Sequence, residues 1–349
     1  MLQLKQYVPI IKSGIAEVGA FRSLYPSVKD VVFPVFLMRP WPNAGHLKFS
    51  IDKLVDAVGD RSFGLALDRG RYANQNTRKA QSEFDALFNE RLGYRAYYDM
   101  VASIPNAVPV LQPTRSASNL LLQIGNADDL DRGVIVHQRR GSEVPLSDMI
   151  VGIAPMPHDS VIIVDAGWSR DYNALEAFTL PIVERVLRSL PNAEIVIASS
   201  SFPDKFDHIV GNSEEEGTER RLFSVLRQRH NEADLTYGDW ASTRPQQEGG
   251  GGNRIPSRVD IPKSSSWEIF RADPKNDLGF PEMAWKAQHH DCFGTVPDCW
   301  GKETIIVTND EGVGVTSPRV AAEVRINIHM TIQSEASSIA PSDEIPYED

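Results

Sequence analysis

Polar side chains able to bind ions or move protons stand at the ends of apolar runs along the whole chain. The clearest run, Val161–Val164, stops at Asp165. Cations at such positions suit a phosphate or carboxylate ligand, whereas carboxylates suit general acid–base chemistry or a divalent metal. In chain order, the residues that follow the runs are Lys12, Arg39, Asp68, Gln112, Gln138 with Arg139, Asp165, Ser199 and Asp239.

The apolar runs predict buried parallel strands. Val161–Val164 is β-branched at every position, and a strand that is apolar on both faces is typical of a parallel sheet covered by helices. Helical stretches follow the runs, and Asn173–Leu190 is the most clearly amphipathic. The predicted strands are Tyr7–Lys12, Val31–Met38, Ser62–Leu67, Ala107–Leu111, Gly133–His137, Asp159–Trp168, Glu194–Ala198 and Leu235–Tyr237.

Eight strand–helix units in a row predict a single α/β domain, a (β/α)8 barrel of the TIM type. The alternative is a doubly wound open sheet. That fold usually needs fewer strands, and its G-x-G-x-x-G fingerprint is absent from the first turn. A barrel brings the carboxyl ends of all its strands to one face. We therefore expect catalytic roles for Lys12, Asp68, Asp165 and Asp239, and ligand binding by Arg39, Gln112, Gln138, Arg139, Ser199 and Arg271.

The segment 241–317 interrupts the eighth unit. It opens with a Gly-rich, linker-like stretch, Thr243–Arg254, and includes a β-branched run, TIIV at 304–307, that predicts a strand. We expect an insertion over the carboxyl-end face, between the eighth strand and a last helix at Pro318–Ile332. Residues 1–333 would then form the barrel, and 334–349 a disordered acidic tail rich in Pro and Ser.

Within this insertion, Trp267–Arg271 reads as a strand. Alternation would place Trp267, Ile269 and Arg271 on one face, with the two apolar residues against the barrel rim. Arg271 would then reach the acidic residues of the site. Two roles stay open for it: an ion pair that neutralises the acids, or a planar clamp on an anionic ligand.

The metal content of such a site is not determined by the sequence. Asp68, Asp165 and Asp239 suit a divalent cation, but no ligand spacing specifies one. The segment His289–Cys292 and Cys299 carry donors that zinc accepts, yet their spacing matches no standard zinc motif. Reduced thiols in a partly buried loop are the favoured interpretation there.

Composition excludes several classes of protein. The chain has 349 residues and a net charge of −11, which disfavours extensive nucleic-acid binding because a basic surface dominates that affinity. No apolar run approaches the roughly 20 residues of a membrane helix. Two cysteines in so long a chain indicate a reduced, cytoplasmic protein.

Several short motifs together resemble the Beta protein family. They are YVPIIK at Tyr7–Lys12 with Gly14, Glu17 and Phe21, YGDW at Tyr237–Trp240, WEIFR at Trp267–Arg271, and INIHM around His329. The resemblance spans nearly the whole chain. The family is named from a phage protein and occurs in prophages and bacterial mobile regions, so the resemblance implies a phage-related or defence-related setting. It implies no catalytic residues.

Two hypotheses for function follow. The first is an enzyme that acts on a phosphorylated or otherwise anionic small molecule, such as a nucleotide, with hydrolysis assisted by a metal. The second is a non-catalytic barrel that senses a ligand or binds a protein encoded by a neighbouring gene in an anti-phage system. Turnover of a nucleotide panel would support the first, and copurification without turnover the second.

Overall fold

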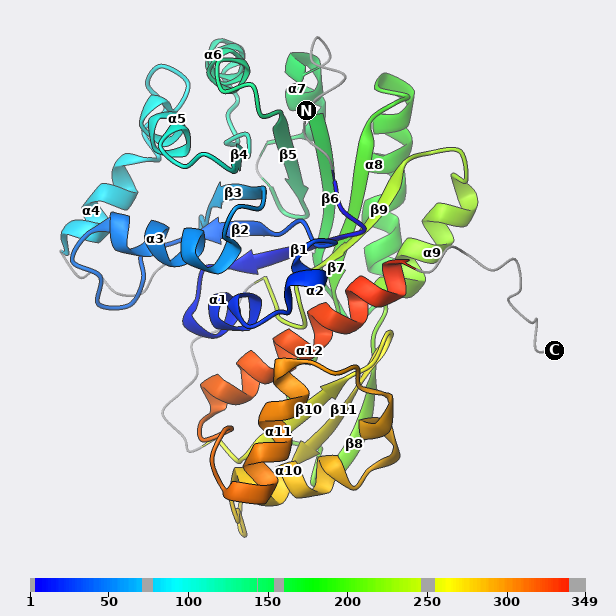
Figure 1. Ribbon diagram of the computed structural model, residues 1–349. Helices are drawn as coiled ribbons and strands as arrows, with labels where there is room; N and C mark the ends of the chain where they lie inside the picture. Colours follow the sequence, from blue (N-terminus) through cyan, green and yellow to red (C-terminus); the bar gives the residue numbers. More distant parts are fainter. Residues whose placement is uncertain (1–3, 71–77, 143, 154–159, 246–254, 339–349) are drawn as a thin grey trace.

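Eight parallel strands form the main sheet of the computed structural model, which describes residues 4–70, 78–142, 144–153, 160–245 and 255–338 (Figure 1). Their order in the sheet is β4-β3-β2-β1-β9-β7-β6-β5. A parallel bridge between Val110 and Ile135 joins the two ends of this order, so the sheet closes on itself and the predicted (β/α)8 barrel is confirmed. The barrel strands are β1 (Tyr7–Lys12), β2 (Val35–Met38), β3 (Phe63–Leu67), β4 (Ala107–Pro109), β5 (Val134–Arg139), β6 (Ser160–Trp168), β7 (Glu194–Ser200) and β9 (Leu235–Asp239).

Helices cover the outside of this barrel. They are α1 (Ile15–Arg22), α2 (Pro26–Lys29), α3 (Leu47–Val58), α4 (Lys79–Ala86), α5 (Arg95–Ala102), α6 (Ala117–Asp128), α7 (Leu146–Ile153), α8 (Tyr172–Ser189), α9 (Glu219–Arg229) and α12 (Pro318–Ser338). The segment between β3 and β4 forms two helices, α4 and α5, and not one long helix, because Leu92 and Tyr94 adopt positive φ angles that no helix interior accepts.

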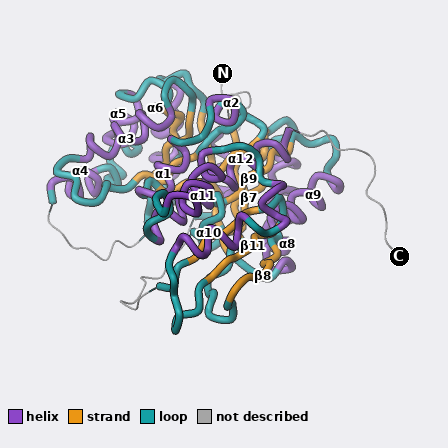
Figure 2. Tube along the Cα trace, turned by 60° about the horizontal axis from the view of Figure 1, so that its bottom comes forward, coloured by secondary structure: helices purple, strands orange, loops and turns teal. Residues whose placement is uncertain are grey.

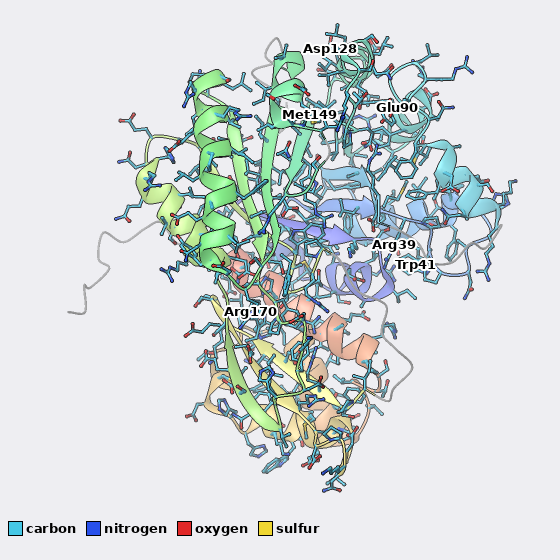
Figure 3. All side chains as sticks on the ribbon, turned by 180° about the vertical axis from the view of Figure 1, so that it is seen from behind. Arg39, Trp41, Glu90, Asp128, Met149 and Arg170 are labelled. Carbon is cyan, nitrogen blue, oxygen red and sulfur yellow. The ribbon has the colours of Figure 1, made fainter. Side chains whose placement is uncertain are left out.

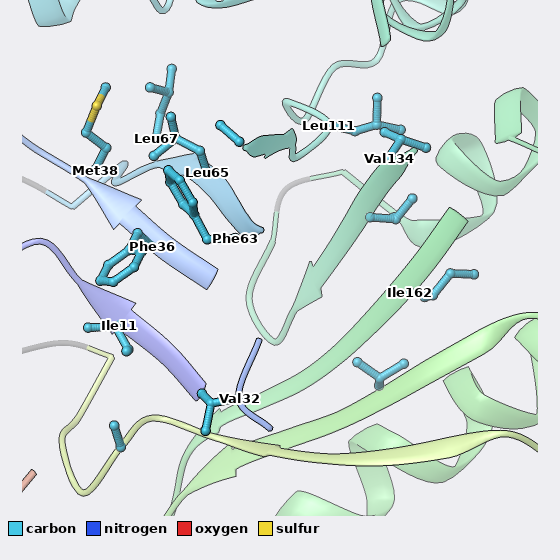
Figure 4. Close-up of a cluster of buried hydrophobic side chains, with 14 of the residues drawn as sticks. Ile11, Val32, Phe36, Met38, Phe63, Leu65, Leu67, Leu111, Val134 and Ile162 are labelled. Atoms are coloured by element: carbon cyan, nitrogen blue, oxygen red, sulfur yellow. The ribbon is translucent and has the colours of Figure 1, made fainter. Parts of the chain in front are cut away.

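Two apolar layers explain why the strands are hydrophobic at nearly every position. Side chains such as Val8, Ile10 and Ile163 fill the barrel interior. Their sequence neighbours, such as Ile11 and Ile162, pack outward against the helices, and Figure 4 shows part of this outer layer. Full burial of one such side chain contributes roughly 1.5–3 kcal/mol. Alternation along each strand therefore decides which polar residues at its carboxyl end face inward.

A smaller unit with a three-stranded antiparallel sheet packs beside the barrel (Figures 1 and 2). Its elements are β8 (Gly211–Glu216), β10 (Arg258–Pro262), β11 (Ser266–Arg271), α10 (Phe280–Gln288), the short 3-10 helix η1 (Asp291–Thr295) and α11 (Trp300–Glu311). The unit is not made from one segment, because β8 lies between β7 and α9 of the barrel and pairs with β11. The run at 304–307, expected as a strand, lies within α11. Ile305 and Ile306 pack in the core of the small unit, and a short apolar run does not distinguish a helix from a strand.

The long helix α12 belongs to both cores. Ile326 and Met330 pack into the outer barrel layer, whereas Val324 and Ile328 pack into the core of the small unit. These pairs lie on opposite faces of the helix because residues four apart share a face and residues two apart do not. The helix continues to Ser338, so Ser334–Ser338 are helical, and 339–349 lie outside the described residues.

Candidate functional site at the carboxyl ends of the barrel strands

Cationic side chains gather at the carboxyl ends of β1, β2 and β5. Lys12 follows the inward-facing Val8 and Ile10 by alternation and is only 8% exposed. Burial lowers the pKa of Lys12; Asp68 opposes this effect, and the charges of Arg39 and Arg139 add to it. These four side chains are therefore close enough to act on one another, although 127 positions separate Lys12 and Arg139 in sequence. The barrel brings together four of the residues predicted from strand ends.

A histidine and an aspartate from neighbouring strands form a buried pair at the same end of the barrel. Nε2 of His137 on β5 lies 3.0 Å from Oδ2 of Asp165 on β6, and Asp165 is fully buried. The indole Nε1–H of Trp240 and the backbone N–H of Gly167 both donate to Oδ1 of Asp165, at 3.0 and 2.8 Å. Burial raises the pKa of Asp165, but the hydrogen bond and charge of His137, the charge of Arg139 and the hydrogen bond of Trp240 together hold the pKa below its ordinary value.

This arrangement fixes the orientation of the imidazole. Because Nε2 of His137 faces a carboxylate, Nδ1 is the ring nitrogen left for a ligand or a water. The guanidinium of Arg139, two residues along β5, lies over the ring of Trp240 at 5.1 Å. A proton-transfer group and a cation therefore stand side by side on one strand.

Asp239 points the other way. Tyr7 on the neighbouring strand β1 and Tyr237, two residues earlier on β9, belong to the outer layer, and both hydroxyls donate to the carboxylate of Asp239, at 2.5 and 3.0 Å. Nε2 of His329, on α12, lies 2.7 Å from Oδ2 of Asp239. Asp239 is thus buried between β9 and α12, on the outer side of the barrel wall, while the next residue, Trp240, faces the interior.

Three further predicted residues, Gln112, Gln138 and Ser199, are buried, and the two glutamines form hydrogen bonds with backbone carbonyls. The amide of Gln112 donates to the carbonyl of Val110, and Oε1 of Gln112 accepts a hydrogen bond from Arg69 at 3.4 Å. The amide of Gln138 donates to the carbonyl of Arg139. Gln138 and Ser199 alternate with inward-facing residues, so both lie on the outer side of their strands. The register brings neither of them to the cationic cluster.

Arg271 contacts the segment that follows β7. Its guanidinium donates to the carbonyl of Ile209 at 2.8 Å and to the carboxylate of Asp207 at 3.1 Å. The predicted alternation of β11 is observed: Trp267 and Ile269 pack in a cluster with Phe202 and Ile209. Figure 3 labels Arg170 at this junction between barrel and small unit, where it donates to the carbonyl of Glu216 and the carboxylate of Glu215.

Sequence reasoning missed two residues of this end of the barrel, His137 and Trp240. His137 was taken as the last residue of a strand and Trp240 lies beyond the predicted eighth strand, whereas Arg139 and Asp239 beside them were selected for charge. The alternation of side chains along a strand could have identified both. His137 shares its strand face with Arg139, and Trp240, two residues after the inward-facing Gly238, also faces inward, whereas Asp239 does not.

Within the described residues, no group of three or more His, Cys, Asp or Glu side chains is placed to hold a metal ion. Asp239 lies on the opposite side of the barrel wall from Asp68 and Asp165. Cys292 and Cys299 are free and buried, and burial raises the pKa of the Cys292 thiol to about 11. The described helices include none long and apolar enough to cross a membrane.

The chain is a (β/α)8-barrel protein with cations and an Asp–His pair at the carboxyl ends of its strands. Its family follows from the sequence profile of the Beta protein family, which matches residues 7–335, so the chain belongs to that family. A comparison with curated proteins found no match.

Proposed function

We propose that the carboxyl-end face of the barrel binds an anionic small molecule, phosphate- or nucleotide-like, and that His137 and Asp165 supply acid–base chemistry to it. One observation supports this most. Lys12, Arg39 and Arg139 converge there, and the pKa of Lys12 stays lowered although the charges of Asp68 and Glu17 act against burial and the two arginines. A cluster of cations that its neighbouring carboxylates offset only in part suits an external anion.

In this proposal the three cations hold the anionic group and Asp68 helps to keep Lys12 charged. His137 accepts a proton through Nδ1 from a water or a hydroxyl of the ligand, and the carboxylate of Asp165 stabilises the imidazolium that forms. The reaction class is hydrolysis or group transfer at the anionic centre. Segment 241–317, whose β11 contacts the loops after β7 and β9, would limit access of solvent to this face.

The family's occurrence in prophages and mobile regions supports a phage-related role for such a ligand. Binding without turnover would correspond instead to a sensor, or to a component that a neighbouring gene product completes. Turnover that depends on His137 distinguishes an enzyme from these two alternatives.

The test is calorimetric binding of inorganic phosphate, pyrophosphate and nucleoside mono-, di- and triphosphates, followed by a turnover assay with and without Mg²⁺. Lys12→Met and Arg139→Met should each weaken binding at least tenfold, or about 1.4 kcal/mol. His137→Asn should keep binding and lower turnover by about 10²–10⁴-fold, the usual effect of a general base. Arg95→Met, on the exposed surface of α5, is the control for lost charge.

Equal binding by the wild type, Lys12→Met and Arg139→Met would remove the anion site from this face. Binding that depends on both residues, with no turnover of any tested compound, would retain the site and remove the acid–base role of His137.

A further inference from the structure

Three arginines meet where the small sheet faces the barrel. Arg258 on β10 and Arg271 on β11 are directly opposite each other in the antiparallel register. Like charges at such positions destabilise a sheet unless something lies between them. The third, Arg325, comes from α12. Side-chain exposures of 22%, 8% and 8% show that Arg258, Arg271 and Arg325 are largely removed from water.

Carboxylates neutralise this group incompletely. Asp260 lies 2.9 Å from Nε of Arg258 and 2.9 Å from Nη1 of Arg325, so two arginines share one buried carboxylate. Arg271 pairs with Asp207, whose side chain is 91% exposed and therefore well solvated. Among the described residues, three largely buried positive charges are thus paired with one buried carboxylate and one exposed carboxylate. Burial of such an excess of positive charge is costly.

The hydrogen-bonding capacity of the group is also incomplete. Nε of Arg325 is buried and has no acceptor among the described residues, which is rare for a buried polar atom. The guanidinium groups of Arg258 and Arg325 lie over the rings of Phe206 and Phe202, at 3.5 and 4.3 Å from the centroids. Stacking of this kind holds a guanidinium plane in place while its edge stays available to a planar or tetrahedral oxyanion.

We propose that Arg258, Arg271 and Arg325 form a second anion site, which binds a phosphate or carboxylate group of a small molecule at the junction of the barrel and the small unit. The site is separate from the cations at Lys12. Its ligand would contact elements of both units: α12, β10, β11 and the segment after β7. Binding would therefore also hold the small sheet against the barrel.

The experiment measures binding of inorganic phosphate and of succinate to the full chain, at constant ionic strength, in the Lys12→Met background. This background removes a cation of the barrel face. The result for the arginine site therefore does not depend on the anion site proposed at the barrel face. We expect saturable binding of at least one of the two probes; the phosphate arm and the succinate arm identify which oxyanion the arginines accept.

Two variants test the assignment in opposite directions. Arg258→Gln should weaken binding at least tenfold. Asp207→Asn removes a carboxylate that competes for Arg271 and should tighten binding at least threefold. Asp207 is exposed, so this variant is expected to fold even if Arg258→Gln does not. Asp204→Asn is the matched control, because it removes the same charge from an exposed position in the same segment.

Absence of saturable binding by both probes would overturn the proposal. So would equal affinities of Asp207→Asn and Asp204→Asn, because a general change of charge, and not relief of competition at Arg271, would then account for the effect. A lower melting temperature of Arg258→Gln with unchanged probe affinity would show that the arginines only join the two units.

Discussion

Replacement of Asp239 by asparagine should destabilise the protein strongly, because this carboxylate is buried at the contact between β9 and α12. It accepts hydrogen bonds from the hydroxyls of Tyr7 and Tyr237 and from the backbone N–H of Ala241, and it pairs with His329. An asparagine keeps the shape but loses the charge, and its amide N–H groups face groups that already donate.

The expected magnitude follows from these contacts. Removing one partner of a buried ion pair costs about 3–5 kcal/mol, and each buried group left without a partner costs about 1–3 kcal/mol. Because asparagine retains one acceptor oxygen, we expect a loss of about 4 kcal/mol in the free energy of unfolding, measured by urea denaturation. The control is Asp52→Asn, which breaks an exposed pair with Lys48 at 2.6 Å and should cost at most about 1 kcal/mol.

The pH dependence gives a second measure. Burial raises the pKa of Asp239, but the charge and hydrogen bond of His329, with the hydrogen bonds from Tyr7 and the backbone of Ala241, together hold the pKa below its ordinary value. A carboxyl group with a lowered native pKa stabilises the fold above its unfolded pKa, about 3.9, and loses this contribution as pH falls through the native pKa. The wild type should therefore lose more stability than Asp239→Asn below about pH 4. A destabilisation below about 1 kcal/mol at neutral pH would refute the structural role assigned to this carboxylate.

Further expected outcomes concern packing and thiol reactivity. Gly238→Ala should lower the free energy of unfolding by about 1–3 kcal/mol, because a Cβ there would lie 2.7 Å from the carbonyl oxygen of Val8 inside the barrel. The control is Gly45→Ala, whose Cβ would meet nothing within 4 Å and which should change stability in urea by less than about 1 kcal/mol. Equal effects of the two substitutions would contradict the close packing at Gly238. Cys292, whose pKa burial raises to about 11, should react with a thiol reagent at pH 8 far more slowly in the folded protein than in denaturant, whereas a fast native reaction would contradict its burial.

Short-range pattern was enough to predict the barrel. Each strand is apolar on both faces because one face packs inside the barrel and the other against helices, so the runs at Val161–Val164 and Ile195–Ile197 stand out without any knowledge of their neighbours. The order of these runs with intervening helices then determined the eight-unit fold. The same pattern placed Lys12, Arg39, Asp68 and Arg139 near one another, because the carboxyl ends of parallel strands meet at one face.

Which side of the wall a polar residue faces was decided only by the tertiary structure. Asp165 and Asp239 both follow apolar strands, yet Asp165 faces inward to His137, and Asp239 faces outward to a helix 90 residues later in the chain. A shift of one residue in register reverses the direction of a side chain, and strand ends are the least certain part of any sequence pattern. The pairing of β8 with β11 and the junction of Arg258, Arg271 and Arg325 depend on contacts between distant segments, which no local periodicity encodes.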